Sequence, residues 1–111
     1  MITFYSAKNL KEVFNGNATI FLNFQNKIMS QLIKLYNSQE GNEYKFLDLL
    51  VKLDPYGDKE FTDQELSNLI ILLKQLITTV HDNKTREFLI SLKVFCEEVR
   101  KTGNKLIAAG D

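Results

Sequence analysis

The sequence predicts a mainly all-α protein, a compact bundle of about four to five helices with at most a minor β pair between its termini. Three long segments repeat apolar residues at the spacing of one helix face, over residues 18–36, 66–80 and 84–102. Turn-forming residues separate these segments. A chain of 111 residues can bury one hydrophobic core but not two, so residues 1–111 are expected to form a single domain.

The N-terminal third is expected to start with a short strand over residues 1–5, where apolar and polar residues partly alternate. Ser6 then caps a short helix that runs through Phe14. A long helix follows from about Ala18 to Tyr36 and is closed by a loop at residues 38–42. Its core-facing stripe is Ile20, Phe24, Ile28, Leu32 and Leu35, widened by Phe21, Met29 and Tyr36.

Three further helices are expected in the second half of the chain. A short one covers residues 46–53, a long one covers residues 62–80, and a last one spans residues 84–102 with Gly103 just past its end. Residues 104–111 are too apolar for a solvated terminus, so they form either a strand beside residues 2–5 or a buried extended arm. The predicted centre of the core is Leu73, Leu76, Phe88, Leu92 and Phe95.

Composition and charge exclude several classes of protein. The formal net charge is zero, which argues against non-specific binding of nucleic acid or of an anionic membrane. Residues 40–65 nevertheless carry eight carboxylates and three lysines, a local charge of −5 that suits a basic partner or a solvated surface. The chain shows neither a signal peptide nor an apolar run long enough to span a membrane, and its single Cys96 indicates a reducing compartment. A cytoplasmic location and a monomer are expected.

Residues for catalysis are scarce. One His and one Cys cannot complete a zinc site, and Cys96 lies on the apolar stripe of the last helix, whereas His81 lies in a connection. No glycine-rich phosphate loop is present. The sequence therefore predicts a protein that is not an enzyme, with no catalytic residues, no cofactor and no bound metal.

The acidic segment from Asp54 to Glu65 has two interpretations. As a degenerate calcium loop, its ligand positions one, five, seven, nine and twelve fall to Asp54, Asp58, Glu60, Thr62 and Glu65. Tyr56 at position three and Lys59 at position six both weaken this interpretation, because an oxygen ligand and a Gly are wanted there. A single EF-hand-like calcium-binding protein stays an alternative function.

As a structural turn, the same segment needs no metal. Thr62-Asp63-Gln64-Glu65 has the form of a capping box that starts the following helix. Phe61 and Leu66 occupy the positions of a hydrophobic staple. Pro55 sets one backbone angle of a turn in which Gly57 tolerates a positive φ. Such a turn either serves the fold alone or displays its side chains to a protein partner.

The motif Asp54-Pro55-Tyr56-Gly57-Asp58, followed by Phe61 and a terminal Gly110-Asp111, resembles a family of small bacterial proteins of about this length. Their pattern is Asp-Pro-Tyr-Gly-Asp-Thr-x-Phe-Asn with a Gln three residues on, and a tail that ends in Phe-Ile-Gly-Asp. The resemblance covers residues 46–111. The chain departs from the family's Thr, Asn, Gln and Phe-Ile at Lys59, Thr62, Glu65 and Ala108-Ala109.

The resemblance implies an immunity protein of a toxin system, such as contact-dependent growth inhibition. Such a protein binds and blocks its cognate toxin domain without catalysis of its own. A nuclease toxin presents a basic cleft to its substrate, so an acidic surface suits it. The residues expected to bind the toxin are Asp54, Tyr56, Asp58, Glu60 and Asp63.

Overall fold

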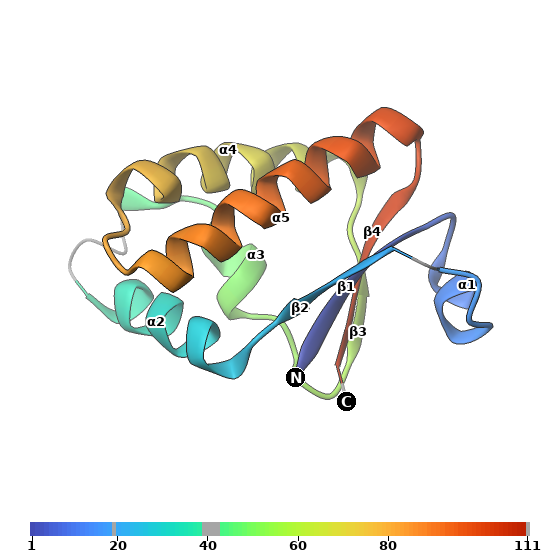
Figure 1. Ribbon diagram of the computed structural model, residues 1–111, viewed down its shortest axis with the longest axis horizontal. Helices are drawn as coiled ribbons and strands as arrows, with labels where there is room; N and C mark the ends of the chain where they lie inside the picture. Colours follow the sequence, from blue (N-terminus) through green and yellow to red (C-terminus); the bar gives the residue numbers. More distant parts are fainter. Residues whose placement is uncertain (19, 39–42, 111) are drawn as a thin grey trace.

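The computed structural model describes residues 1–18, 20–38 and 43–110, and these form a mixed α/β fold (Figure 1). The predicted mainly all-α helical bundle is therefore wrong. The predicted loop at residues 38–42 lies, except for Ser38, outside the described residues, as does Asp111. The elements are, in chain order, β1 Ile2–Ala7, α1 Leu10–Phe14, β2 Phe21–Phe24, α2 Asn26–Asn37, α3 Asp48–Val51, β3 Asp58–Glu60, α4 Asp63–Thr79, α5 Asn83–Thr102 and β4 Lys105–Gly110.

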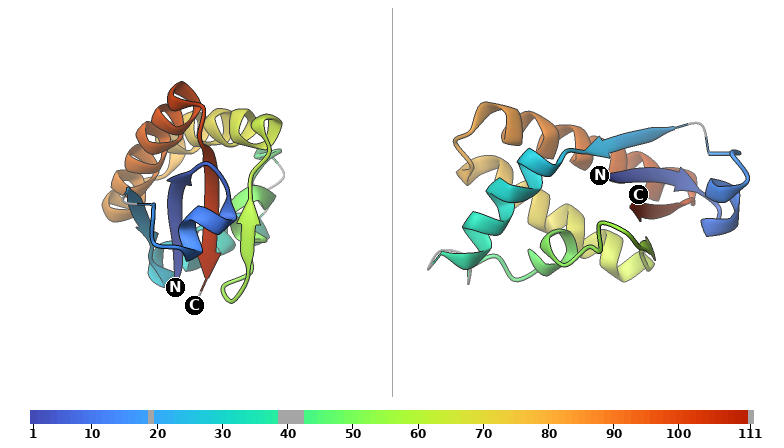
Figure 2. Two further views of the ribbon diagram at one scale, coloured as in Figure 1. Left: turned by 90° about the vertical axis from the view of Figure 1, so that its right-hand side faces the viewer. Right: turned by 90° about the horizontal axis from the view of Figure 1, so that it is seen from below.

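The four strands form one antiparallel sheet in the order β2-β1-β4-β3. Helix α5 packs against the sheet and α4 runs beside α5, so both helices cover the same face (Figure 1). The short helix α1 lies on the other side of the sheet (Figure 2). We call this second side the open face. Side chains alternate along each strand, so Phe4 faces the helices, whereas Tyr5 belongs to the open face.

The prediction of one long helix from about Ala18 to Tyr36 is wrong in its first part, where strand β2 forms instead. Residues 18–36 were expected to form one helix, but residues 21–24 pair with β1 and the helix begins only at Asn26. Ile28 and Leu32 face the core as predicted, and so does Phe24, but Phe21 is 58% exposed. A short apolar run fits either a strand or a helix, and here the available partner strand β1 decides.

The termini pair as strands, which confirms one of the two predictions for the tail. β4 lies between β1 and β3, and its register with β1 runs from Ile2 opposite Gly110 to Ala7 opposite Lys105. β1 extends past the expected residues 1–5, so Ser6 is not a helix cap. Asn9 caps α1 instead, because its side chain accepts a hydrogen bond from the Glu12 N–H at 3.0 Å.

Helices α4 and α5 confirm the two long helices predicted over residues 62–80 and 84–102. α5 ends at Gly103, which has the left-handed backbone (φ 77°) expected past a helix end. Asp82 caps its start by accepting hydrogen bonds from the N–H and the hydroxyl of Thr85, which hold the pKa of the Asp82 carboxyl below its ordinary value. The helix predicted over residues 46–53 is shorter, since only α3 is regular.

One hydrophobic core joins the sheet to the helices. It contains four of the five residues predicted at its centre, but Phe95 is only partly buried and packs at its margin. Three phenylalanines that the sequence analysis did not group connect the layers: the Phe24 ring stacks on Phe4 and on Phe88, with centroids 5.7 and 4.9 Å apart. Among the helices of the described residues, none is both long and apolar enough to cross a membrane.

Candidate functional site

The segment between α3 and β3 is a tight turn ordered by its own residues. The Gly57 N–H donates to the Asp54 carbonyl at 3.2 Å, and the Tyr56 N–H donates to the Asp54 carboxylate at 2.9 Å. Pro55 occupies the second position of the turn, where its fixed φ is favourable. We call residues 54–60, which comprise this turn and β3, the acidic turn.

The glycine of the motif and the glycine of the tail both lie in close contacts. Gly57 does not adopt the positive φ that we expected. Instead, a Cβ at Gly57 would lie 2.8 Å from an oxygen of the Asp54 side chain. Gly110 donates its N–H to the Gly57 carbonyl at 2.8 Å, and a Cβ on Gly110 would overlap the carbonyl group of Pro55. The motif and the tail, which are distant in sequence, thus form one structural unit.

The predicted capping box follows the acidic turn and is confirmed. The Glu65 N–H donates to the Thr62 hydroxyl at 3.1 Å, and the Thr62 N–H donates to the Glu65 carboxylate at 3.0 Å. Lys59 also donates to this carboxylate, at 2.7 Å. The Lys59 hydrogen bond, followed by that of Thr62, lowers the pKa of Glu65 below its ordinary value. Phe61 and Leu66 are both buried in the core, as expected for a hydrophobic staple.

The five residues predicted to bind a partner are all exposed. They fall into two groups, because two of them use their carboxylates in contacts within the chain. Tyr56 is 83% exposed. Asp58 and Glu60 alternate with the inward Lys59 and so lie on the open face, and neither forms an ion pair with a described residue. Asp54, in contrast, uses its carboxylate to hold the turn, and Asp63 pairs with Lys105 at 3.2 Å.

The geometry disfavours the calcium interpretation. The segment is divided among a turn, a strand and the first turn of a helix, so it does not form one continuous calcium-binding loop. Glu65, the expected bidentate ligand, already accepts from Lys59 and Thr62. Within the three described ranges, no cluster of three or more His, Cys, Asp or Glu side chains is placed to hold a metal ion.

The open face also presents residues that the sequence analysis placed in a helix core. The strand registers align Asp58, Ala109, Thr3 and Asn23 in one row across the sheet. A second row aligns Glu60, Ile107, Tyr5 and Phe21, of which Ile107 is buried. The rings of Tyr5 and Phe21 lie 6.2 Å apart. The carboxylates at the β3 edge and the aromatic pair at the β2 edge therefore share one face. In the sequence, only the short, β-prone apolar run at residues 20–24 is consistent with a strand here, and such a run fits a helix equally well.

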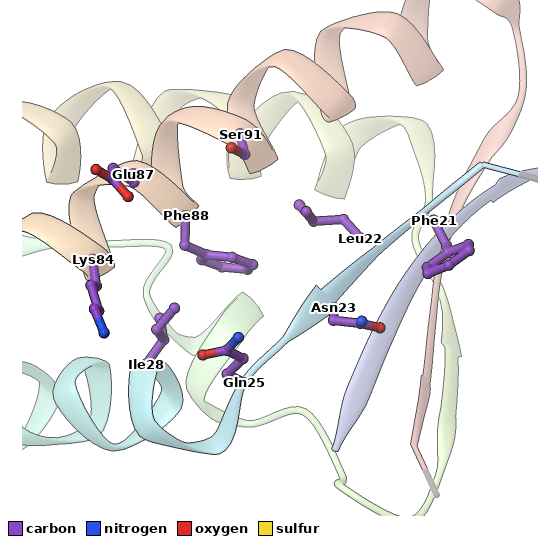
Figure 3. A pocket seen from close by; sticks show the side chains of 9 residues that line it. All are labelled: Phe21, Leu22, Asn23, Gln25, Ile28, Lys84, Glu87, Phe88 and Ser91. Atoms are coloured by element: carbon purple, nitrogen blue, oxygen red, sulfur yellow. The ribbon is translucent and has the colours of Figure 1, made fainter.

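The other residues that could take part in catalysis or ligand binding lie in separate parts of the molecule. Cys96 is buried, and burial raises the pKa of its thiol to about 12, so it is a poor nucleophile at neutral pH. His81 is exposed in the connection between α4 and α5. A groove of about 590 Å³ lies between β2 and α5 (Figure 3). Its lining includes one carboxylate, Glu87, and one ammonium group, Lys84, together with apolar and uncharged polar side chains.

The fold and the site together define an α/β protein that displays a rigid acidic and aromatic turn at one edge of an antiparallel sheet. No match to this chain was found among protein-family models, among curated proteins or among solved structures.

Proposed function

We propose that this protein is a toxin-neutralising immunity protein, which binds a basic toxin domain through the acidic turn and blocks it. One observation carries the proposal: a turn held by its own hydrogen bonds presents Tyr56, 83% exposed, next to two carboxylates that have no ion-pair partner among the described residues. A Tyr side chain has only two rotatable bonds to immobilise and here stands on a hydrogen-bonded turn, so it loses little conformational entropy on binding and suits an interface anchor.

Electrostatics supports a basic partner. Asp58 and Glu60 lie two residues apart on one strand, and their side chains point to the same face. Two free carboxylates so close together attract a positively charged surface and accelerate its association. A toxin that cleaves nucleic acid has such a surface at its substrate cleft. The resemblance of the Asp-Pro-Tyr-Gly-Asp motif to immunity proteins points to the same partner.

The test is binding to the toxin-like domain encoded by the neighbouring open reading frame, together with protection of cells that express it. Asp58→Lys and Glu60→Lys should each weaken binding about tenfold, because each introduces repulsion at the interface rim. Glu43→Lys is the matched control: it makes the same charge change at an exposed carboxylate outside the acidic turn. Thermal melts of all three variants should stay close to that of the parent, because exposed charges contribute little to folding.

Tyr56→Ala tests the proposed anchor. It should weaken binding by on the order of 2 kcal/mol with little change in stability, since the ring is exposed. If Tyr56→Ala, Asp58→Lys and Glu60→Lys all bind as tightly as the parent, the toxin-binding surface lies elsewhere on the molecule. Failure of the parent to bind any cognate toxin would remove the immunity function itself.

A further inference from the structure

Both edges of the sheet present outward main-chain groups, but they differ in their charges. In the β1 ladder, Ser6 donates its N–H to Ile20, and hydrogen-bonded pairs alternate along antiparallel strands. Leu22 therefore turns its N–H and C=O toward β1, whereas Phe21 and Asn23 turn theirs to the outer edge of β2. No described residue hydrogen-bonds to these outward groups.

The opposite edge is protected by charge. By the same alternation, Asp58 and Glu60 direct their main-chain groups outward from β3, and each carries a carboxylate. A second copy pairing there would place like charges opposite each other, which destabilises strand pairing. β2 has no charged residue among its four. Only the β2 edge can therefore accept a copy of itself without charge repulsion.

We propose that two copies of this chain pair edge to edge through β2, antiparallel and centred on Leu22, which joins two four-stranded sheets into one. In this register Phe21 lies opposite the partner's Asn23, and Asn23 lies opposite the partner's Phe21. Phe21 and Asn23 are the residues of β2 whose N–H and C=O groups point outward. Each pairing of Phe21 with the Asn23 of the other copy is therefore joined by main-chain hydrogen bonds. The contact is isologous and closes at a dimer.

Helix α5 provides a self-complementary flank to this contact. Ser91 and Leu22 line the same groove between α5 and β2 (Figure 3). Exposed residues follow Ser91 along one helix face in both directions, at intervals of three and four. Seven residues before Ser91 this face carries Lys84, and seven residues after it Glu98, neither of which is ion-paired within the described part of the chain.

A two-fold axis near Leu22 and Ser91 runs the two α5 helices antiparallel. Lys84 of each copy then comes opposite Glu98 of the other, so two attractive contacts flank the paired strands. Val94, one turn after Ser91 and 58% exposed, supplies apolar surface between them. This dimer departs from the monomer expected from the sequence. It is independent of the proposed function, because the acidic turn lies at the other edge of the sheet.

The experiment is sedimentation equilibrium of the full chain from about 1 to about 500 µM, where a species of twice the 12.8 kDa chain mass is expected at the upper end. Asn23→Pro removes the outward N–H without touching the β1 ladder, so it should give a monomer. Asn23→Ala is its matched control: it loses the same side chain, including the contact with the Thr3 hydroxyl, but keeps the N–H and should dimerise.

A charge swap tests the α5 contact and does not depend on the strand variants. Lys84→Glu and Glu98→Lys should each weaken dimerisation about tenfold, because each change acts at two symmetric contacts, and the double variant should recover the parent affinity. Circular dichroism checks that every variant is folded. A parent that stays monomeric throughout, an Asn23→Pro variant that dimerises like Asn23→Ala, or a charge swap that does not recover affinity would each overturn the proposal.

Discussion

At the scale of single residues, the two glycines at the acidic turn are constrained by different neighbours. A Cβ on Gly110 meets the backbone carbonyl of Pro55, whereas a Cβ on Gly57 meets only the side chain of Asp54, with a carboxylate oxygen nearest. Backbone in a paired strand and a proline turn cannot retreat, but a carboxylate can rotate away. The tail glycine is therefore the more restrictive of the two.

We expect Gly110→Ala to lower the free energy of unfolding by about 1 to 3 kcal/mol, as overpacking of a tight contact does. Gly57→Ala should cost less, and its cost should shrink further in an Asp54→Ala background, where the obstructing carboxylate is gone. Urea denaturation of the four variants measures this. Equal losses for Gly110→Ala and Gly57→Ala would show that the Pro55 carbonyl can move.

The lowered pKa of Glu65 leads to a second prediction about a single residue. Its folded-state pKa is depressed, chiefly by Lys59, so its contribution to stability is present above the unfolded-state pKa and is lost as pH falls through the folded-state pKa. Glu65→Gln keeps the capping geometry but removes the charge. Because the ion pair is partly solvated, we expect a loss of only about 0.5 to 1 kcal/mol at pH 7.

The check for Glu65 is the difference in unfolding free energy between parent and Glu65→Gln, measured at several pH values. This difference should vanish at a pH low enough to protonate Glu65 in the folded state. A difference that persists unchanged into acid would assign the effect to the capping hydrogen bonds rather than to the charge.

At the scale of elements, α5 is the helix that contacts the most other elements of the described fold. It contacts the sheet, α4 and α2, and Leu92 at its middle is fully buried. Its opposite face is open to solvent, as shown by Ile90, which is 42% exposed. One helix thus offers a buried and an exposed aliphatic residue with nearly the same chemistry.

Leu92→Ala should cost roughly 2 to 5 kcal/mol, because it leaves a cavity in the core. Ile90→Ala, the matched control, should stay within about 1 kcal/mol. Thermal or urea unfolding of both variants gives the comparison. A loss below about 0.5 kcal/mol for Leu92→Ala would contradict the burial of this side chain.

At the scale of the whole molecule, the sheet and the helices share one core, which includes residues from β1, β2, β4 and all helices from α2 to α5. The acidic turn joins this core through Phe61, the residue that follows it, and through the pairing of β3 with β4. Since hydrogen bonds and the Lys59 ion pair order that region, we expect its stability to be independent of a metal.

Thermal melts in the presence of calcium and of a chelator should therefore coincide. Circular dichroism at a helix-sensitive wavelength is the measurement, with magnesium as a control for non-specific ionic effects. A marked rise in the melting midpoint with micromolar calcium alone would restore the calcium interpretation of residues 54–65.

The sequence by itself determined the features that depend on neighbours along the chain. The capping box at Thr62, the glycine at the end of α5 and the apolar stripes of α4 and α5 all rest on contacts within a few residues, so their signals survive without a fold. Even the terminal strand pair was among the predictions, because the apolar tail needed a buried place and residues 2–5 already alternated.

Only the tertiary structure decided the rest. Residues 21–24 suit a helix or a strand, and the choice depends on β1, a partner outside that segment. The predicted carboxylates look alike in sequence, but Lys105, 42 residues away, pairs with Asp63, whereas Asp58 and Glu60 have no ion-pair partner among the residues that the structure describes. The close contact of Gly110 with the Pro55 carbonyl likewise joins two segments that are far apart in the sequence. Such features arise between distant segments, where no local propensity records which groups will meet.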